Sequence, residues 1–247
     1  TIAEFLGMNV AVQAINPGNP VLLNDYTGSV DMSSGQKQEA RPEANLVHLG
    51  VAEMAHHLNV PIWTINCSGA VEADAQMAWE CMAIVLSQYL SGVDIIGSLG
   101  GVSTDDVVDP RAQVMANEIA SWVKHFAKGI RIDEETVPLD LMVELGAAPL
   151  GGNYLGAEHT LKWYKDTLWR PSKLTSSLAR DAWVEAGEVR IMSRARDMVE
   201  EILAKHEPKV PESQQKALRE LVAEILDREG VKGGEAKRIM DLTYWKG

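Results

Sequence analysis

Three apolar runs of the sequence each end in uncharged polar side chains, which are the first candidates for a binding site. The candidates are Asn24, Tyr26, Thr64, Asn66, Ser68 and Ser98. Because side chains alternate across a strand, we expect the candidates on each run to share one face. Such groups suit a pocket that positions a substrate, and the ring of Tyr26 could hold a quaternary ammonium ion. The alternative is that they form turns where the strands end.

The charged groups that catalysis often needs are missing from these positions. A Schiff-base lysine, a pair of carboxylates or a Ser-His-Asp set would have to come from elsewhere, so no catalytic residue is assigned. Six acids lie near the strand ends, and we interpret most of them as helix caps or solvated charges. These acids are Asp25, Asp31, Glu72, Asp74, Asp105 and Asp106. Cys67 and Cys81 are interpreted as buried thiols, and no metal site is predicted.

A glycine-rich stretch, residues 97–101, follows the third apolar run. Backbone amides in such a strand-to-helix turn can cradle a phosphate group. This stretch alone supports a different class of enzyme, an aldolase or isomerase with a phosphate site.

The apolar runs at 21–23, 61–66 and 94–99 are separated by segments with helical periodicity. We predict helices over residues 2–15, 43–58, 72–90, 107–127, 133–145, 158–169, 180–205 and 211–227. Strands that alternate with helices are typical of a parallel sheet with crossover helices. The Gly-x-Gly-x-x-Gly fingerprint is missing, which favours a barrel over a dinucleotide-binding fold. The predicted fold class is α/β, the carboxyl-terminal part of a (β/α)8 TIM barrel with a helical C-terminal extension. Residues 1–145 would form the βα units, and 146–247 the helical completion.

Composition excludes several classes of protein. The 247 residues carry 35 acidic and 23 basic side chains, a net charge of −12, which disfavours binding to nucleic acid or anionic membranes. Two cysteines fit a reducing compartment, and no apolar run is long enough to cross a membrane. We therefore expect a cytoplasmic protein that forms homo-oligomers. The helix at residue 2 lacks a cap in front of it, so we expect a piece of a longer chain that folds poorly on its own.

Specific residues resemble the trimethylamine methyltransferase family. In residues 16–42 the matching positions are Pro17, Gly18, Pro20, Val21, Asp31, Met32 and Gly35. A second stretch is similar to the family's D-x-Q-x-x-Y-E motif, with Asp74, Gln76 and Glu80 matched and Trp79 in place of tyrosine. Residues 152–161 are similar to its G-x-[FY]-L-G-x-x-H-T-L motif, and further matches continue to Pro208.

The resemblance implies transfer of a methyl group from an N-methylated amine to the cobalt(I) of a separate corrinoid protein. No cofactor would be bound tightly, because the corrinoid (cobalamin) belongs to that partner. Members that act on trimethylamine carry pyrrolysine in the barrel, and this sequence has none, so it resembles the glycine betaine branch. A quaternary nitrogen leaves as a neutral amine, and the reaction then needs positioning and desolvation more than an acid. On this resemblance Gly100, Gly101 and His159 are expected to face the corrinoid.

Two alternatives stay open within this reading. The substrate could be another N-methyl compound, such as carnitine, proline betaine or trimethylamine, or the chain could be a non-catalytic subunit that docks a corrinoid protein. We also predict that Tyr154 and His159 serve mainly structure, with His159 buried and satisfied by a backbone carbonyl.

Overall fold

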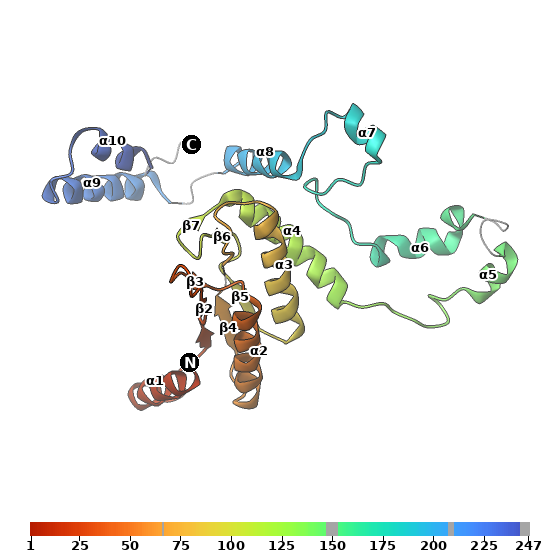
Figure 1. Cartoon of the computed structure of the whole chain (residues 1–247), viewed down its shortest axis with the longest axis horizontal. Coiled ribbons are helices and arrows are strands. Elements are labelled where there is room, and N and C mark those ends of the chain that lie inside the picture. Colours follow the sequence, from red (N-terminus) through yellow and green to blue (C-terminus); the bar gives the residue numbers. More distant parts are fainter. Residues whose placement is uncertain (66, 147–152, 207–209, 243–247) are drawn as a thin grey trace. The chain divides into compact units, whose positions relative to one another are not determined.

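The computed structural model describes residues 1–65, 67–146, 153–206 and 210–242 (Figure 1). The chain divides into two compact units, residues 1–199 and 200–247. Within the described residues, none of the helices is both long and apolar enough to cross a membrane.

A three-stranded parallel sheet forms the centre of the first unit. Its strands are β1 (Leu23–Asp25), β4 (Ile62–Ile65) and β5 (Ile95–Gly97), in the order β1-β4-β5. Leu23 pairs with Ile62, and Ile65 pairs with Gly97. The prediction of three parallel neighbouring strands is confirmed, and the fold is a mixed α/β fold.

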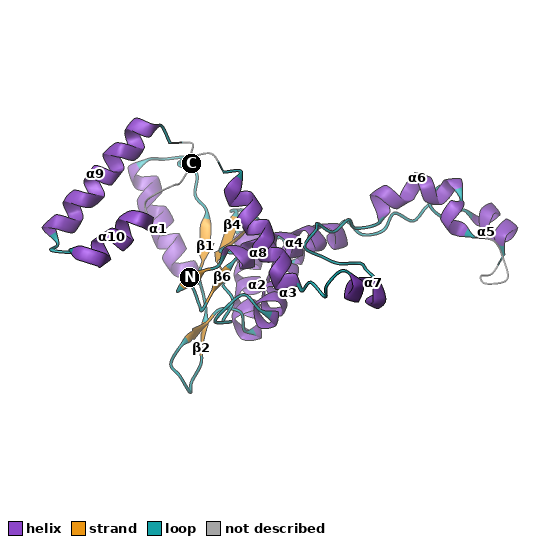
Figure 2. Ribbon diagram, turned by 90° about the horizontal axis from the view of Figure 1, so that it is seen from above, coloured by secondary structure: helices purple, strands orange, loops and turns teal. Residues whose placement is uncertain are grey.

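Long helices lie beside this sheet (Figure 2). They are α1 (Ile2–Ile15), α2 (Pro42–His57), α3 (Ala75–Leu90) and α4 (Pro110–Ala127). Helix α2 packs on β1 and β4, α3 packs on β5, and α3 also packs along α4. Two apolar clusters result, one between the sheet and α2 and the other between α3 and α4. Their packing holds the strand ends in fixed positions.

The two faces of the sheet differ in burial. The helix face carries Leu23, Asp25, Ile62 and Thr64, all fully buried. Register partners in neighbouring strands point to the same side, so Asn24, Trp63 and Ile95 share the other face, which we call the open face. Side chains on the open face are exposed or half-buried.

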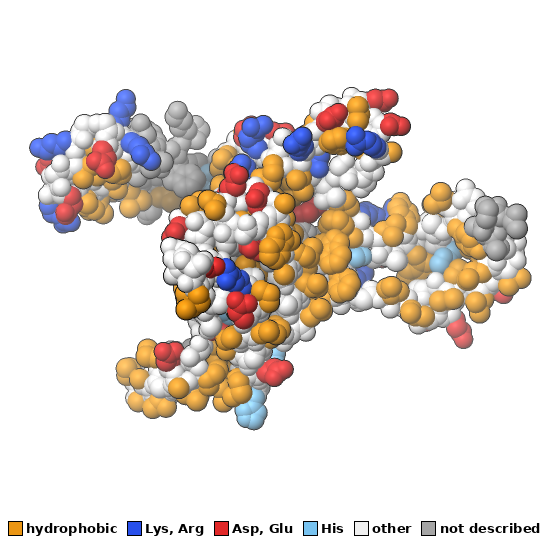
Figure 3. Space-filling model, viewed as in Figure 1, with side chains coloured by type: hydrophobic (Ala, Val, Ile, Leu, Met, Phe, Trp, Pro, Cys, Tyr) orange, Lys and Arg blue, Asp and Glu red, His pale blue; other side chains and the backbone are white. Residues whose placement is uncertain are grey.

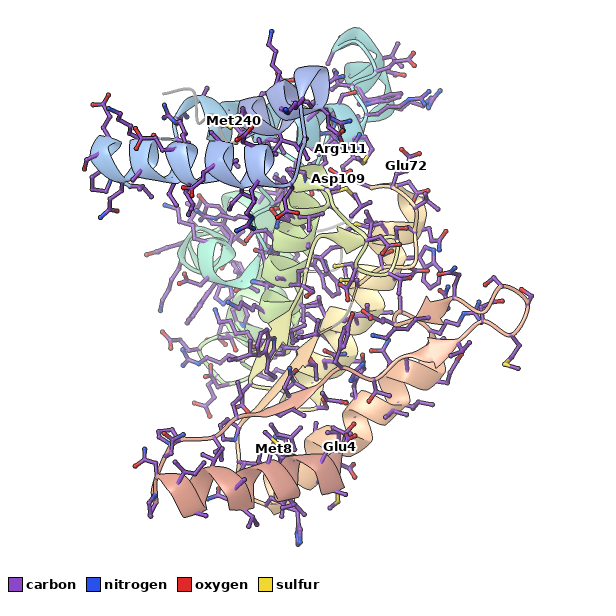
Figure 4. All side chains as sticks on the ribbon, turned by 90° about the vertical axis from the view of Figure 1, so that its left-hand side faces the viewer. Glu4, Met8, Glu72, Asp109, Arg111 and Met240 are labelled. Carbon is purple, nitrogen blue, oxygen red and sulfur yellow. The ribbon has the colours of Figure 1, made fainter. Side chains whose placement is uncertain are left out.

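Two short antiparallel hairpins were not expected from the sequence. One joins β2 (Ser29–Val30) to β3 (Lys37–Gln38), and the other joins β6 (Gly101–Val102) to β7 (Val107–Val108). Strand β7 occupies the first residues of the helix predicted over 107–127. Helix α4 begins later because the Asp109 side chain accepts the Arg111 N–H and Pro110 stands at the first helical position. Figure 4 shows Asp109 and Arg111 together at this helix start, where their side chains also form an ion pair of 2.6 Å.

The remaining helices follow the predicted order with shorter bounds. They are α5 (Leu139–Leu145), α6 (Glu158–Thr167), α7 (Arg180–Glu185) and α8 (Ile191–Ala204), with a 3-10 turn at Tyr154–Gly156. The helix predicted over 180–205 is interrupted because Gly187 and Glu188 both have positive φ, at 89° and 55°. In the second unit, α9 (Glu212–Arg228) packs against α10 (Gly233–Leu242).

Candidate functional site

The carboxyl ends of the parallel strands bring five polar or aromatic side chains together. We call them the strand-end cluster: Tyr26, Lys37, Glu39, Cys67 and Asp105. Tyr26 directly follows β1, and Cys67 comes two residues after β4. Lys37 and Glu39 come from strand β3 and the residues after it, and Asp105 comes from the turn between β6 and β7. Both hairpins therefore contribute to the site.

Glu39 lies at the centre of the strand-end cluster and is fully buried. Its Oε2 accepts the backbone N–H of Cys67 at 2.9 Å, and its Oε1 lies 2.5 Å from the Lys37 Nζ. The same Nζ lies 3.1 Å from the centroid of the Tyr26 ring. A buried carboxylate is stable only with a partner, and Lys37 supplies it. The ammonium group is thus held between a carboxylate and an aromatic face.

Asp105 accepts hydrogen bonds from two members of the cluster, the hydroxyl of Tyr26 and the thiol of Cys67. The hydrogen bond to Asp105, with burial, raises the pKa of Tyr26 far above its usual range. Burial raises the pKa of the Cys67 thiol, and the hydrogen bond to Asp105 raises it further. Both groups therefore keep their protons at neutral pH. The site combines neutral donors, two carboxylates and one ammonium group.

A tight turn positions Lys37 and Glu39 by closing the β2–β3 hairpin. Asp31 Oδ1 accepts the backbone N–H groups of Ser33 and Ser34 at 2.9 and 3.1 Å, and Asp31 also pairs with Arg41. The Ser33 hydroxyl also donates to Asp31 Oδ1, and this hydrogen bond, with those from Arg41 and the two backbone N–H groups, lowers the pKa of the Asp31 carboxyl group below its usual range. Gly35, with φ of 71°, adopts a backbone conformation that favours glycine. The matched positions Asp31 and Gly35 therefore build the hairpin.

Glu80 holds the loop that carries Cys67. Its Oε2 accepts from the Ser68 hydroxyl at 2.6 Å and from the Gly69 N–H at 2.8 Å, and its Oε1 accepts from Gln76 at 2.9 Å. Asp74 caps helix α3 by accepting the backbone N–H of Gln76 at 2.8 Å. The motif of Asp74, Gln76 and Glu80 thus fixes the end of β4 to the start of α3.

The sequence-predicted residues fall into two groups. Asn24 lies on the open face, and Tyr26, which follows β1, is exposed and belongs to the strand-end cluster. The side of Thr64 was predicted wrongly, because it is the register partner of Asp25 and faces the helices. There its hydroxyl donates to Gln88 at 2.7 Å. On β4 the covered face carries a polar residue and the open face carries apolar ones. The alternation of polar and apolar side chains therefore does not reveal which face is covered.

The other predicted residues serve the surrounding loops. Ser68 turns toward Glu80, as described above. Ser98 has φ of 56°, and its carbonyl oxygen lies 3.5 Å from the Cys67 Sγ. Asn66 lies outside the described residues. Among the acids, Asp74 is a helix cap, whereas Asp25 is an exception to the general expectation, because it is buried and its Oδ2 lies 2.7 Å from His48 Nδ1.

The glycines after β5 mark close packing. A Cβ on Gly100 would lie 2.2 Å from the Gln113 Cγ, and a Cβ on Gly101 would lie 2.2 Å from the Cys67 Sγ. Gly101 therefore lets the β6–β7 hairpin approach Cys67. The expected roles of Gly100 and Gly101 toward a corrinoid, and of residues 97–101 toward a phosphate, stay predictions.

His159 lies in a different part of the described structure. It lines a cavity of about 860 Å³ with Phe126, Trp163 and other residues of α4 and α6. Its Nε2 is 3.2 Å from the Glu135 carbonyl oxygen, and the Tyr154 hydroxyl donates to the Gly146 carbonyl at 3.2 Å. The contact of His159 with a backbone carbonyl is of the predicted kind, but the side chain is half-buried rather than buried. A corrinoid-facing role for His159 stays a prediction.

Lys37 and Glu39 were missed by the sequence reasoning. The sequence signal for Lys37 and Glu39 is that they stand two residues apart, which places two side chains on one face of an extended segment. That signal needs the hairpin to be recognised, and two-residue strands carry no periodicity.

Three side chains of the cluster could also contact a metal ion. The ligand atoms of Glu39, Cys67 and Asp105 lie within 4.8 Å of one another. Lys37 already neutralises Glu39, however, and the raised pKa of Cys67 keeps its thiol protonated. The arrangement as it stands is a hydrogen-bonded and ion-paired cluster.

Parallel strands, covering helices and a polar cluster at the strand carboxyl ends are the arrangement of a small-molecule site in an α/β protein. A family model described as trimethylamine methyltransferase (MTTB) matches residues 1–228. The chain belongs to this family.

Three relatives show what the chain is similar to. It is 30% identical to a trimethylamine methyltransferase and to a glycine betaine methyltransferase, both from Desulfitobacterium hafniense. It is 27% identical to a proline betaine:corrinoid methyltransferase of Eubacterium limosum. The matches cover 92%, 83% and 82% of this chain but 45%, 42% and 42% of the relatives. The chain thus spans less than half the length of these relatives.

Proposed function

We propose that the protein transfers a methyl group from a quaternary, betaine-type amine to the cobalt(I) of a cognate corrinoid protein. The strand-end cluster is the part of this chain that would contribute to the amine site. The observation that carries the proposal is the ammonium group of Lys37, held between the ring of Tyr26 and the buried carboxylate of Glu39. A site that holds one organic cation in this way has the chemistry to hold another.

We also propose that this chain forms part of a (β/α)8 barrel. The order β1-β4-β5, parallel throughout, with helices over one face, supports a part of a (β/α)8 barrel. The open face would then line the barrel interior, and the strand-end cluster would lie at its catalytic mouth.

The cluster suits a methyl transfer that needs no proton. The corrinoid of the partner would supply the cobalt(I) nucleophile. As the C–N bond breaks, its electron pair returns to the nitrogen, and a neutral tertiary amine leaves. Aromatic and carboxylate groups can bind the permanent charge and position the methyl carbon. The protonated state of Cys67 also removes a competing thiolate nucleophile from the site.

The test is methylation of cob(I)alamin, followed by its spectral change, with glycine betaine, proline betaine, carnitine and trimethylamine. Tyr26→Ala should weaken the apparent affinity for the substrate roughly 5- to 30-fold, from the loss of about 1–2 kcal/mol of cation–π attraction. Tyr26→Phe keeps the ring and should retain most of the affinity. Tyr89→Ala, an exposed tyrosine on α3, is the matched control.

Two results would count against the proposal. Unchanged kinetics in Tyr26→Ala would remove the strand-end cluster from the amine site. Binding of a corrinoid protein without methyl transfer from any amine would favour the alternative, a docking subunit.

A further inference from the structure

Lys37 occupies the place that a substrate cation would need. Its Nζ lies 3.1 Å from the Tyr26 ring centroid and 2.5 Å from the Glu39 Oε1. This oxygen accepts no hydrogen bond from any other described residue. A quaternary ammonium ion can therefore reach both the ring and the carboxylate only if the ammonium of Lys37 moves away.

The side chain of Lys37 can move out of the strand-end cluster, whereas that of Glu39 cannot. The lysine side chain is 36% exposed, whereas Glu39 is fully buried. The lysine stem lies over Gly28, where a Cβ would stand 2.8 Å from the Lys37 Cε. A long flexible stem over a small residue lets the ammonium group swing toward solvent while it stays tethered near the site.

The charge balance then selects the ligand. A simple cation that displaces the ammonium of Lys37 gains Glu39 but leaves the lysine without a carboxylate partner. A zwitterion brings its own carboxylate, so one ion pair is exchanged for two and no charge is left unpaired. The displaced lysine stays near the site because Lys37 lies on β3, two residues before Glu39.

We propose that Lys37 is a specificity residue that makes the site prefer zwitterionic quaternary amines, those with a carboxylate, over uncarboxylated ones. This inference rests on the proposed function, because it assumes that the amine binds at the strand-end cluster. The substrate nitrogen takes the place of the lysine on Tyr26 and Glu39, and the lysine pairs with the substrate carboxylate.

The test is the ratio of two dissociation constants, for choline and for glycine betaine, measured by calorimetry on the protein without turnover. These ligands share the trimethylammonium group and differ in a hydroxyl or a carboxylate. The wild type should bind glycine betaine more tightly than choline. Lys37→Met should lower that preference about tenfold or more, through weaker betaine binding and tighter choline binding. Lys37→Arg keeps the charge and should keep a preference for betaine.

The matched control is Lys162→Met. Lys162 also pairs with a glutamate, Glu135, and also lies near an aromatic ring, 5.0 Å from Trp163, but it belongs to α6. This substitution should leave the ratio unchanged. Lys37→Gln is a second variant in case Lys37→Met does not fold, and the wild-type ratio needs no variant at all.

Equal affinity of the wild type for the two ligands, or an unchanged ratio in Lys37→Met and Lys37→Gln, would overturn the inference. Methyl transfer from glycine betaine to cob(I)alamin is measured separately. If methyl transfer occurs but the Lys37 substitutions leave the ratio of dissociation constants unchanged, the inference fails and the proposed function stands. If the ratio shifts as expected but no amine is demethylated, the proposed function fails and the specificity role stands.

Discussion

Asp105 raises the pKa of two residues next to it, Tyr26 and Cys67. It lies in a turn where Ser103, Thr104 and Asp105 all have positive φ, at 53°, 52° and 73°. This turn is tied to the loop after β4, because the Ser103 N–H donates to the Ala70 carbonyl at 2.7 Å. The carboxylate thereby meets the thiol of Cys67 and the hydroxyl of Tyr26 together. Its charge penalises a second negative charge on either group, so both stay neutral.

The first prediction concerns the pKa of Cys67. Burial and the carboxylate of Asp105 raise this pKa, and Asp105→Asn removes the second cause while burial remains. The thiolate form of Cys67 should therefore appear at lower pH in the variant. Alkylation by iodoacetamide, followed by mass spectrometry across pH 7–10, measures this shift. A Cys81→Ser background removes the other thiol, whose pKa burial raises to about 12. Identical pH profiles with and without Asp105 would contradict the assignment.

At the scale of elements, sequence patterns predicted the helices and strands that are packed against the core. The helices predicted over 43–58 and 72–90 and the three strands were found because long apolar runs and helical spacing both report contact with a core. The β2–β3 and β6–β7 hairpins were missed because each strand has only two residues, too few to show a periodicity. They nevertheless supply Lys37 and Asp105, so the sequence predicted where the site lies better than which charges it holds.

Strand parity gave a divided result for the same physical reason. On β1 the alternation of Leu23 and Asn24 separates a covered face from an open one. On β4 the apolar side chains Trp63 and Ile65 occupy the open face, and Thr64 is buried through its hydrogen bond to Gln88. A buried polar group with a partner cannot be recognised from one strand alone, because its partner lies on a helix 24 residues away.

The second prediction uses two glycines of the first unit. Gly101→Ala should lower the free energy of unfolding by about 1–3 kcal/mol, because the new methyl group meets the Cys67 Sγ at 2.2 Å and the hairpin must move. Gly7→Ala, within α1, meets nothing within 4 Å and should raise it by about 0.5–1 kcal/mol. Urea unfolding of both variants and the wild type gives the comparison. Equal stability of the two variants would show that the close approach at Gly101 does not constrain the hairpin.

At the scale of the whole molecule, much apolar surface of the first unit stays uncovered. Helix α1 has one charged side chain, Glu4, and its Leu6, Met8 and Ile15 are exposed. Figure 3 shows hydrophobic side chains over much of this helix, and Figure 4 places Met8 and Glu4 along it. The open face adds Ile95, which is 48% exposed. Contiguous apolar surface of this kind marks contact with other protein.

The sheet adds a second reason for association. Among the described strands, β1 and β5 each pair on one side, so both edges of the three-stranded sheet present unpaired backbone groups. Unpaired edges are templates for pairing with another chain. A second surface that covers both the apolar faces and the open edges would therefore be bound with a favourable free energy.

The last prediction is that these 247 residues, produced alone, self-associate. Sedimentation velocity at increasing concentration should show dimers or larger species, and heating should give a broad or concentration-dependent transition instead of one cooperative melt. Met8→Lys places a charge on the exposed apolar side of α1 and should shift the distribution toward monomer. Gln214→Lys adds the same charge to the exposed, polar start of α9 in the second unit and serves as the control. A monomer with a single cooperative melt would mean that the open face and the sheet edges are stable in water. In that case the amine affinity of the strand-end cluster could be measured on these residues alone.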